Sequence, residues 1–405
     1  MHEDENDSSP KTNREQPFVQ AMTPPSFALT EAIIFTGEAF VEGQTLLIQE
    51  GKIIDLCQTH AIPDAFIPIA CAGQILTAGY VDCQVNGGDN RMIDSAMDNQ
   101  GLLAIAACHA QKGTTSFLPT CITTSPAAMK HVLEVYRHAR RLDAGLLGIH
   151  FEGPHINVEK KGAHPAEHIR PLSEEDFDLY QKQGDEVMRV TLAPECVTPK
   201  DIEKLTAQGV LVSMGHSMAN AAQAKAAFDS GAHSVTHWMN TMPPITARDP
   251  GLSGFALDEK NCWLSFICDL QHLDPIMVRL AVKAKEGKNI FMVSDASSPA
   301  GADEPKPCTG TSINVTPQGL RCVNEQGTLA GSLLTLGQTV PLAIAKARLD
   351  PALVLRMCST LPAQYLGLDH ILGKLLPGYQ ADVLALDHSF TVQKVWKSGM
   401  RSVEC

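Results

Sequence analysis

Short apolar segments that recur through the middle of the chain constrain its fold more than any other feature. They lie at residues 80–85, 115–120, 146–153, 189–195, 210–216, 234–240, 263–269 and 290–296. Segments this short and this apolar are typical of strands that are buried on both faces of a parallel sheet. Amphipathic or alanine-rich helix patterns separate them. Eight such strands alternating with helices predict a (β/α)8 barrel.

Helix and turn signals fill the segments around these strands. In "SMANAAQAKAAFDSGAH", alanines favour a helix, Ser217 can act as its N-cap and Gly231 can follow its C-terminus. After the last strand, residues 311–329 have the pattern of an inserted β-hairpin. Residues 332–347 return to a helix pattern, in which Pro341 marks a kink or a boundary.

The two ends of the chain differ from its middle. Residues 28–76 and 375–405 contain short alternating strands joined by tight turns, which predicts antiparallel pairing. We expect both segments to form one small β-sandwich domain beside a barrel that spans residues 77–374. Residues 1–27 are acidic and polar and lack the apolar core of a secretory signal, so we expect a disordered tail.

Composition excludes several classes of protein. The formal net charge of −13 at pH 7 argues against a nucleic-acid partner, which would favour a basic surface. No run of 18 apolar residues occurs, so we expect no membrane span. The 12 cysteines form no C-x-x-C pair and many lie in apolar segments, which predicts a reduced, cytoplasmic protein without a disulfide framework.

Polar side chains with metal-binding and acid–base chemistry follow four of the predicted strands. Glu152, His216 and His237 come at or near the ends of three strands, and Asp295 ends the eighth. In a barrel, all these strand ends open on the face that carries the active site. One glutamate with two histidines can hold Zn²⁺ and leave a coordination position open. Each residue also has an ordinary interpretation: a solvated or ion-paired glutamate, core or loop histidines, and an aspartate that caps a helix.

Four longer signatures carry a family resemblance. They are "HFEGPHINVEKKGAHP", "GHSMANAAQAKAAFDSGAHSVTHWMNTMPPITARDPG", "VSDASSPAG" and "GTLAGSLLTLGQ". With these signatures in this order, the chain resembles the N-acetylglucosamine-6-phosphate deacetylase family of the amidohydrolase superfamily, from about residue 28 to residue 403. The resemblance implies a metal-dependent hydrolase of amino-sugar catabolism that forms a homodimer.

The resemblance also implies roles for individual residues. It places the metal ligands at Glu152, His216 and His237, the catalytic acid–base at Asp295, and the contact to the acetamido carbonyl at His164. Contacts to the phosphate and the sugar fall on Ala163, His164, Asn240, Thr241, Arg248 and His272. In this family such contacts can come from a neighbouring subunit. Thr241 stands where the family usually has alanine, and its extra bulk can narrow the sugar pocket.

Two neutral amides bear on the number of metal ions. Many amidohydrolases have an H-x-H motif at the end of the first barrel strand, which supports a second metal ion. Here the corresponding residues are Gln84 and Asn86, and amides are poor zinc ligands compared with imidazole. We therefore expect one divalent ion per subunit, Zn²⁺ or Fe²⁺. We expect the two amides to orient neighbouring groups or to bind waters.

The predicted reaction is hydrolysis of N-acetyl-D-glucosamine 6-phosphate to D-glucosamine 6-phosphate and acetate by a metal-activated water. Deacetylation of the galactosamine epimer is an alternative, because the two substrates differ at a single hydroxyl group. A ring-opening amidohydrolase acting on cyclic amides is another, against which the missing H-x-H motif argues. A binding protein without catalysis is the last, against which the intact set of Glu152, His216, His237 and Asp295 argues.

Overall fold

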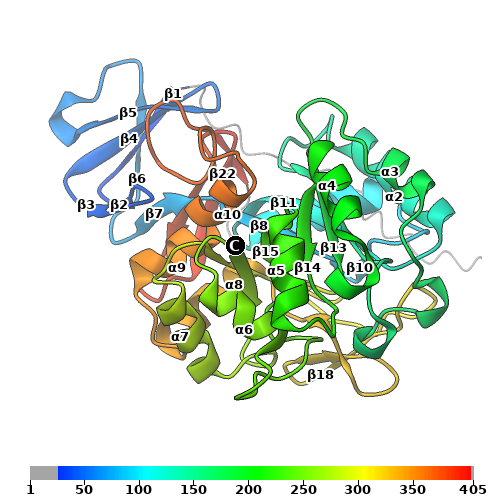
Figure 1. Ribbon diagram of the computed structural model, residues 1–405. Helices are drawn as coiled ribbons and strands as arrows, with labels where there is room; N and C mark the ends of the chain where they lie inside the picture. Colours follow the sequence, from blue (N-terminus) through cyan, green and yellow to red (C-terminus); the bar gives the residue numbers. More distant parts are fainter. Residues whose placement is uncertain (1–25, 403–405) are drawn as a thin grey trace, which may run out of the picture.

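The computed structural model describes residues 26–402 and contains a barrel with a smaller unit beside it (Figure 1). Residues 1–25, which make up most of the expected tail, lie outside the described residues, as do residues 403–405. The last two residues of that expected tail, Ser26 and Phe27, belong to the first strand, β1 (Ser26–Thr30). Within residues 26–402, every helix is too short or too polar to span a bilayer.

Eight parallel strands form the barrel sheet, in the order β17-β16-β15-β14-β13-β12-β11-β8. Their bounds are Tyr80–Val85 (β8), Thr114–Ile122 (β11), Gly148–Glu152 (β12), Val187–Leu192 (β13), Leu211–Met214 (β14), Ser234–Val235 (β15), Trp263–Ile267 (β16) and Ile290–Val293 (β17). Each of the eight apolar segments contains or overlaps one of these strands. The predicted barrel is therefore confirmed.

Backbone hydrogen bonds link the first and last strands and complete the ring. The amide of Asp295 donates to the carbonyl of Gln84 at 3.1 Å, and the amide of Asn86 donates to the carbonyl of Ala296 at 2.9 Å. These bonds lie at the C-terminal ends of β8 and β17. Closure of the barrel therefore brings the polar residues at these two strand ends next to one another.

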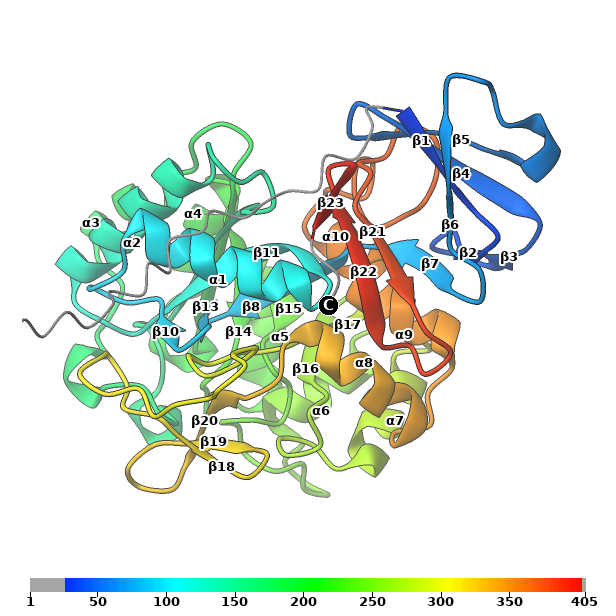
Figure 2. The same cartoon turned by 180° about the vertical axis from the view of Figure 1, so that it is seen from behind.

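Helices cover the outside of the barrel (Figures 1 and 2). Their bounds are Asn99–Gln111 (α1), Pro126–Ala139 (α2), Glu174–Leu179 (α3), Pro199–Ala207 (α4), Ala221–Asp229 (α5), Gly251–Asp258 (α6), Pro275–Ala284 (α7), Leu336–Ala345 (α8), Pro351–Cys358 (α9) and Thr360–Tyr365 (α10). Helix α2 shows why they pack there, because Met129, Val132, Leu133 and Tyr136 form one buried face against β11 and β12. Short 3-10 turns lie at Val158–Lys160 (η2), Ala166–His168 (η3) and Pro194–Cys196 (η4).

The helix predicted after the fifth strand begins later than expected. Helix α5 starts at Ala221, and its N-cap is Asn220, which forms a capping box. The prediction of Ser217 as N-cap was wrong, because the Ser217 hydroxyl instead donates to Glu195 at 2.7 Å. Gly231 does follow the end of the helix, with a φ of 109° that favours glycine.

The segment after β17 contains the predicted hairpin and one further strand. The strands β18 (Thr316–Gln318), β19 (Arg321–Val323) and β20 (Leu329–Ser332) form a small antiparallel sheet. Two short strands at the barrel mouth, β9 (Gly87–Gly88) and β10 (Arg91–Met92), form another. Helix α8 follows the insertion, and Pro341 lies inside this helix rather than at its boundary.

Both ends of the chain build the smaller unit, as Figure 2 shows for the first and last strands. One sheet has the order β5-β4-β1-β6 and the other β23-β22-β21-β7-β2-β3. The bounds not yet given are Ile33–Phe35 (β2), Phe40–Val41 (β3), Gln44–Gln49 (β4), Lys52–Gln58 (β5), Thr59–Ala61 (η1), Ile67–Ala70 (β6), Ile75–Ala78 (β7), Val383–Leu386 (β21), Val392–Lys397 (β22) and Met400–Ser402 (β23). Phe27, Ile48, Leu76 and Trp396 belong to a core of this unit's own. A small domain built from both ends is confirmed, and its boundaries at residues 76 and 375 stay a prediction.

Candidate active site

A pocket of about 290 Å³ lies at the C-terminal ends of the barrel strands. Every site residue predicted from the sequence except Arg248 lines its wall. The residues that meet there are Glu152, Ala163, His164, His216, His237, Asn240, Thr241, His272 and Asp295. The barrel therefore gathers side chains that are far apart in the sequence around one cavity.

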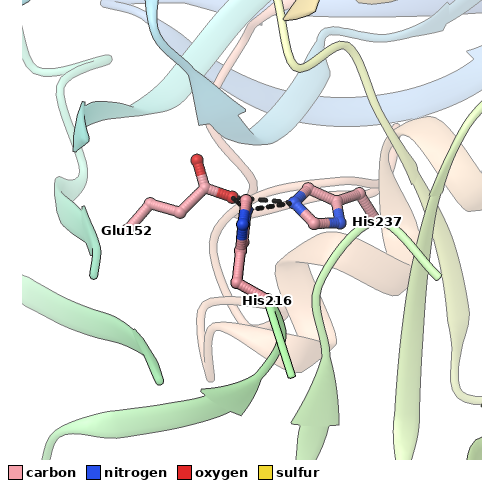
Figure 3. Close-up of side chains that lie close together, drawn as sticks. All are labelled: Glu152, His216 and His237. Atoms are coloured by element: carbon pink, nitrogen blue, oxygen red, sulfur yellow. Dashed lines mark hydrogen bonds and ion pairs between the residues drawn. The ribbon is translucent and has the colours of Figure 1, made fainter. Parts of the chain in front are cut away.

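The side chains of Glu152, His216 and His237 point toward a common centre (Figure 3). The Nε2 atom of His237 lies 2.9 Å from Oε1 of Glu152 and 3.0 Å from Nε2 of His216. The Nε2 atom of His216 lies 3.4 Å from Oε1 of Glu152. Ligands about 2.1 Å from a tetrahedral zinc ion are about 3.4 Å apart, so these spacings fit donors that share one cation. No other group of the described residues meets the spacing for such a site.

The backbone has an unusual conformation where three of these side chains leave the sheet. His216, His237 and Asp295 each stand two residues after the last residue of β14, β15 and β17, respectively. Their φ angles are 47°, 31° and 50°. Positive φ is uncommon for residues other than glycine, and it persists where the surrounding structure enforces it. The same sharp turn thus ends three strands and brings a functional side chain to the pocket each time.

A backbone carbonyl orients the His216 ring. The Nδ1 atom of His216 lies 2.9 Å from the carbonyl oxygen of Lys160, which can only accept a hydrogen bond. The hydrogen is therefore on Nδ1, and the lone pair of Nε2 faces Glu152 and His237. Metal-binding histidines are usually held in this way, by a hydrogen bond from the nitrogen that does not bind the metal.

Charge interactions keep Glu152 ionised. Burial acts to raise the pKa of Glu152, but the interactions of its carboxylate with His164, His216 and His237 outweigh burial and hold that pKa well below its usual value. For His237, burial acts to lower the pKa, and the Glu152 carboxylate raises it overall. Burial and the charge of His216 lower the pKa of His164 to about 4. At neutral pH the pocket thus offers an anionic carboxylate beside a neutral His164.

Asp295 is held by the two amides that replace the H-x-H histidines. Nε2 of Gln84 donates to Oδ1 of Asp295 at 2.9 Å and to Oε1 of Glu152 at 2.8 Å. Nδ2 of Asn86 donates to the same Oδ1 at 2.6 Å. The prediction that these amides orient their neighbours is confirmed. Burial, together with the charge of Glu152, raises the pKa of Asp295 to about 6.

Two loops in close contact form another part of the pocket wall, one carrying Gly162 and His164 and the other carrying Thr241. Nδ1 of His164 lies 2.8 Å from the hydroxyl of Thr123, which fixes the His164 ring. A side chain at Gly162 would meet the γ-methyl group of Thr241 at 2.9 Å, so glycine is needed for the loops to approach this closely. Nδ1 of His272 is held by a carboxylate of Asp269 at 2.8 Å.

Arg248 is the predicted site residue that the structure does not bring to the pocket. Its side chain is exposed and forms no ion pair with a described residue. Its role at the phosphate stays a prediction.

The hairpin insertion supplies pocket residues that the sequence did not single out. Ile313, Thr328, Leu329, Ala330 and Gly331 line the wall opposite the barrel floor. Most of these side chains are apolar or small and carry no distinctive chemistry. The signature "GTLAGSLLTLGQ" was the one available signal, because it begins at residue 327 and includes part of this wall.

Comparison with known proteins identifies the family. The amidohydrolase family matches residues 75–401. N-acetylgalactosamine-6-phosphate deacetylase of Shewanella sp. (strain ANA-3) is 36% identical over 80% of this chain and 82% of its own. N-acetylglucosamine-6-phosphate deacetylase of Haemophilus influenzae is 31% identical over 90% of this chain and 96% of its own.

A solved structure agrees with these relatives. The crystal structure of N-acetylglucosamine-6-phosphate deacetylase from Pasteurella multocida superposes with a TM-score of 0.90 and 32% identity. The superposition covers 94% of this chain and all of that one (100%). The agreement extends over both the barrel and the smaller unit. The chain is therefore an enzyme of the amidohydrolase family and belongs to its amino-sugar-6-phosphate deacetylases.

Proposed function

We propose that this enzyme hydrolyses N-acetyl-D-glucosamine 6-phosphate to D-glucosamine 6-phosphate and acetate. The observation that carries the proposal is the meeting of Glu152, His216 and His237 with Asp295 in one pocket. The relatives act on this class of substrate by name. An amide resists hydrolysis, so the site must supply a strong nucleophile and a proton for the leaving amine.

Glu152, His216 and His237 would hold one divalent cation, Zn²⁺ or Fe²⁺. Their donor atoms are buried, converge at short distances and include a carboxylate that stays ionised. When bound, the ion activates a water molecule for attack and polarises the amide carbonyl. Gln84 and Asn86 do not offer imidazole ligands for a second ion, which supports a single one.

Asp295 is suited to move the proton. Both of its hydrogen bonds from the neighbouring amides end on Oδ1, and no described residue donates to Oδ2. Oδ2 can therefore take the proton of the attacking water and then give it to the amine nitrogen as the C–N bond breaks. A pKa raised to about 6 places the group close to neutral pH, where a base can also act as an acid.

His164 is positioned to stabilise the carbonyl oxygen as it gains negative charge. Its ring is neutral at pH 7, because burial lowers its pKa to about 4. When Thr123 donates its hydroxyl hydrogen to Nδ1, the proton of His164 is on Nε2, which lies 3.7 Å from Oε2 of Glu152 and can be donated to a carbonyl oxygen in the pocket. Such a donor typically contributes about 10²–10³ in turnover.

The phosphate is assigned to His272 and Arg248. His272 lines the pocket, and because its Nδ1 donates to Asp269, its Nε2 donates to an oxyanion only when the ring carries a proton on both nitrogens. Arg248 is exposed and outside the pocket wall, and a guanidinium can bind two phosphate oxygens at once. We expect a homodimer in which Arg248 of each subunit serves the neighbouring site.

Activity on the galactosamine epimer is a second candidate. The relative from Shewanella, at 36% identity, carries the galactosamine name, and the Haemophilus relative, at 31%, carries the glucosamine name. The two substrates differ at one hydroxyl group. Acetate release from both phosphates under identical conditions tests the choice, and a higher kcat/KM for the galactosamine form would overturn the glucosamine assignment.

The same preparation tests the metal requirement. Elemental analysis should find about one zinc or iron per chain, and a chelator should abolish acetate release. Full activity of a metal-free protein would refute the proposed site. We further propose that the protein works in the cytoplasm, where its cysteines, all free in the described part of the chain, stay reduced.

A further inference from the structure

Arg189 is a buried cation that the proposed reaction does not use. It lies in β13, its side chain has no exposed surface, and no carboxylate of the described residues pairs with it. Removal of a charge from water is costly when no opposite charge compensates it. The position of Arg189 in the barrel interior therefore calls for a physical reason.

The Arg189 guanidinium donates to groups on two other barrel strands and on the segment that follows a third. Nη1 donates to the carbonyl of Cys83 on β8 at 2.9 Å. Nη2 donates to the hydroxyl of Thr236, just after β15, at 3.0 Å and to that of Ser213 on β14 at 3.3 Å. A single planar side chain thus connects the segments that lead to both proposed histidine ligands and to the Q-x-N pair.

Two of these contacts lie directly beside site residues. The Cys83 carbonyl belongs to the peptide bond with Gln84, whose side chain donates to Glu152. Thr236 immediately precedes His237. A shift of the guanidinium would therefore move the backbone on which these site groups stand.

The strand of Glu152 is tied to the same network. His150, two residues before Glu152, has its Nε2 atom 2.7 Å from the hydroxyl of Thr191. That hydroxyl lies 2.7 Å from the hydroxyl of Thr236, to which Arg189 donates. The network thus reaches all three strands that carry the Glu–His–His set.

We propose that Arg189 is a positioning residue for the metal site. It holds the strands beneath Glu152, His216 and His237 in register. The inference rests on the proposed metal site and deepens it. Partners that orient metal ligands typically contribute about 10–100-fold in metal affinity.

Lys285 offers a matched control. It is also a buried cation without a carboxylate partner, and its ammonium group donates to backbone carbonyls, among them that of Glu259 at 2.7 Å. These carbonyls lie at and after the end of α6, on the outer layer of the barrel and away from the pocket wall. Loss of Lys285 should therefore lower stability without touching the ligands.

The experiment measures metal binding by the full-length, metal-free chain and its variants Arg189→Met, Arg189→Lys and Lys285→Met. Zn²⁺ affinity is obtained by competition with a chromophoric chelator, and the Co²⁺-loaded proteins are compared by visible absorption. Arg189→Met should bind Zn²⁺ about 10–100-fold more weakly and change the Co²⁺ spectrum. Arg189→Lys should recover part of the affinity, because its ammonium group can still donate to some of the same acceptors. Lys285→Met should stay within about twofold of wild type although its unfolding temperature falls.

The outcomes separate positioning from plain stability. The proposal would be overturned if Arg189→Met bound Zn²⁺ within about twofold of wild type and gave an unchanged Co²⁺ spectrum. Equal weakening by Lys285→Met would overturn it too, because affinity would then follow stability. If Arg189→Met does not fold, Arg189→Lys tests the proposal, because lysine lacks the guanidinium fork. A Lys variant with wild-type Zn²⁺ affinity and an unchanged Co²⁺ spectrum would contradict the strand-holding role. A wild-type chain that binds neither ion refutes the metal site itself, and this inference falls with it.

Discussion

Replacement of Asp295 by asparagine separates proton transfer from metal binding. The hydrogen bonds that hold the carboxylate, from Gln84 at 2.9 Å and from Asn86 at 2.6 Å, both end on Oδ1. In Asp295→Asn the amide oxygen can take the place of Oδ1 and accept both bonds, and the amide nitrogen then takes the place of Oδ2. The fold and the metal ligands should therefore be preserved, but the group that faces the pocket no longer accepts a proton.

The expected loss of activity follows from the two proton transfers assigned to Asp295. Removal of a positioned general acid or base typically costs about 10²–10⁴ in rate. Because Asp295 serves in both steps, we expect kcat to fall by about 10³ or more, which is about 4 kcal/mol of activation free energy. The variant should be as stable as wild type at neutral pH, because it replaces a buried carboxylate that stands beside the charge of Glu152.

The assay combines acetate release from N-acetyl-D-glucosamine 6-phosphate with elemental analysis of the same sample. Asp382→Asn is a matched control, because Asp382 is also a buried aspartate whose pKa is raised by burial, but it lies in the smaller unit. The control should keep full activity. If Asp295→Asn retains its metal and a kcat within about tenfold of wild type, Asp295 is not the proton-transfer group. If the variant loses its metal, Asp295 supports the metal site instead.

Further results test the other roles. A general base works only when it has lost its proton, and the pKa of Asp295 is raised to about 6 by burial and by the charge of Glu152. The ratio kcat/KM should therefore rise with pH through about 6 and then level off; a profile that stays flat far below this pH contradicts the assignment. His237→Ala should lose most of its bound metal and keep the far-ultraviolet circular dichroism of a folded barrel, and full metal content would exclude His237 as a ligand. Arg248→Ala should raise KM for the phosphorylated sugar by about 10–100-fold and leave the weak reaction of N-acetylglucosamine unchanged. Equal losses on both sugars would separate Arg248 from the phosphate.

The barrel could be predicted from the sequence because strands buried on both faces leave a continuous apolar signal. Residues 290–293 are apolar without interruption, and β17 ends at Val293, where Ser294 and Asp295 begin the polar segment. The same change from apolar to polar residues marks the C-terminal end of a parallel strand, where the active site of a barrel lies. At this position one sequence pattern therefore predicts both the strand and the site residue.

The exact extent of the strands was harder to predict. Residues 234–240 are apolar enough for a strand, but β15 contains only Ser234 and Val235. Beyond it, His237, Met239 and Thr241 have positive φ angles, which bend the chain out of the sheet. Residues of these types rarely adopt this conformation without tertiary contacts that enforce it, so nothing in the local sequence indicates the bend.

From the residue types alone, the site could be predicted only where its residues carry distinctive chemistry, whereas Ala163 and Thr241 were placed there by the family resemblance. Glu152 and the two histidines stand out after apolar strands, whereas Ile313 and Leu329 do not differ from ordinary hairpin residues. These two reach the pocket because the insertion folds over the barrel mouth, which is a matter of tertiary packing. Arg248 is the opposite case, because the family resemblance places it at the phosphate but its side chain is exposed and outside the pocket wall.

Gln84 gives a physical reason to expect a single ion in the proposed metal site. Its Nε2 group donates to both Glu152 and Asp295, the two carboxylates that a second cation would otherwise neutralise. The Gln84 amide carries only part of the charge of a cation, so it does not lower the pKa of both acids as a second cation would. Glu152 and Asp295 therefore keep very different proton affinities. In spite of burial, three histidines hold the pKa of Glu152 well below its usual value, whereas burial raises that of Asp295 to about 6. Glu152, which is ionised at neutral pH, is thus fitted to bind metal, and Asp295 is fitted to accept and release a proton near neutral pH. An imidazole at position 84, with a second ion beside it, would lower the pKa of Asp295 and weaken it as a base.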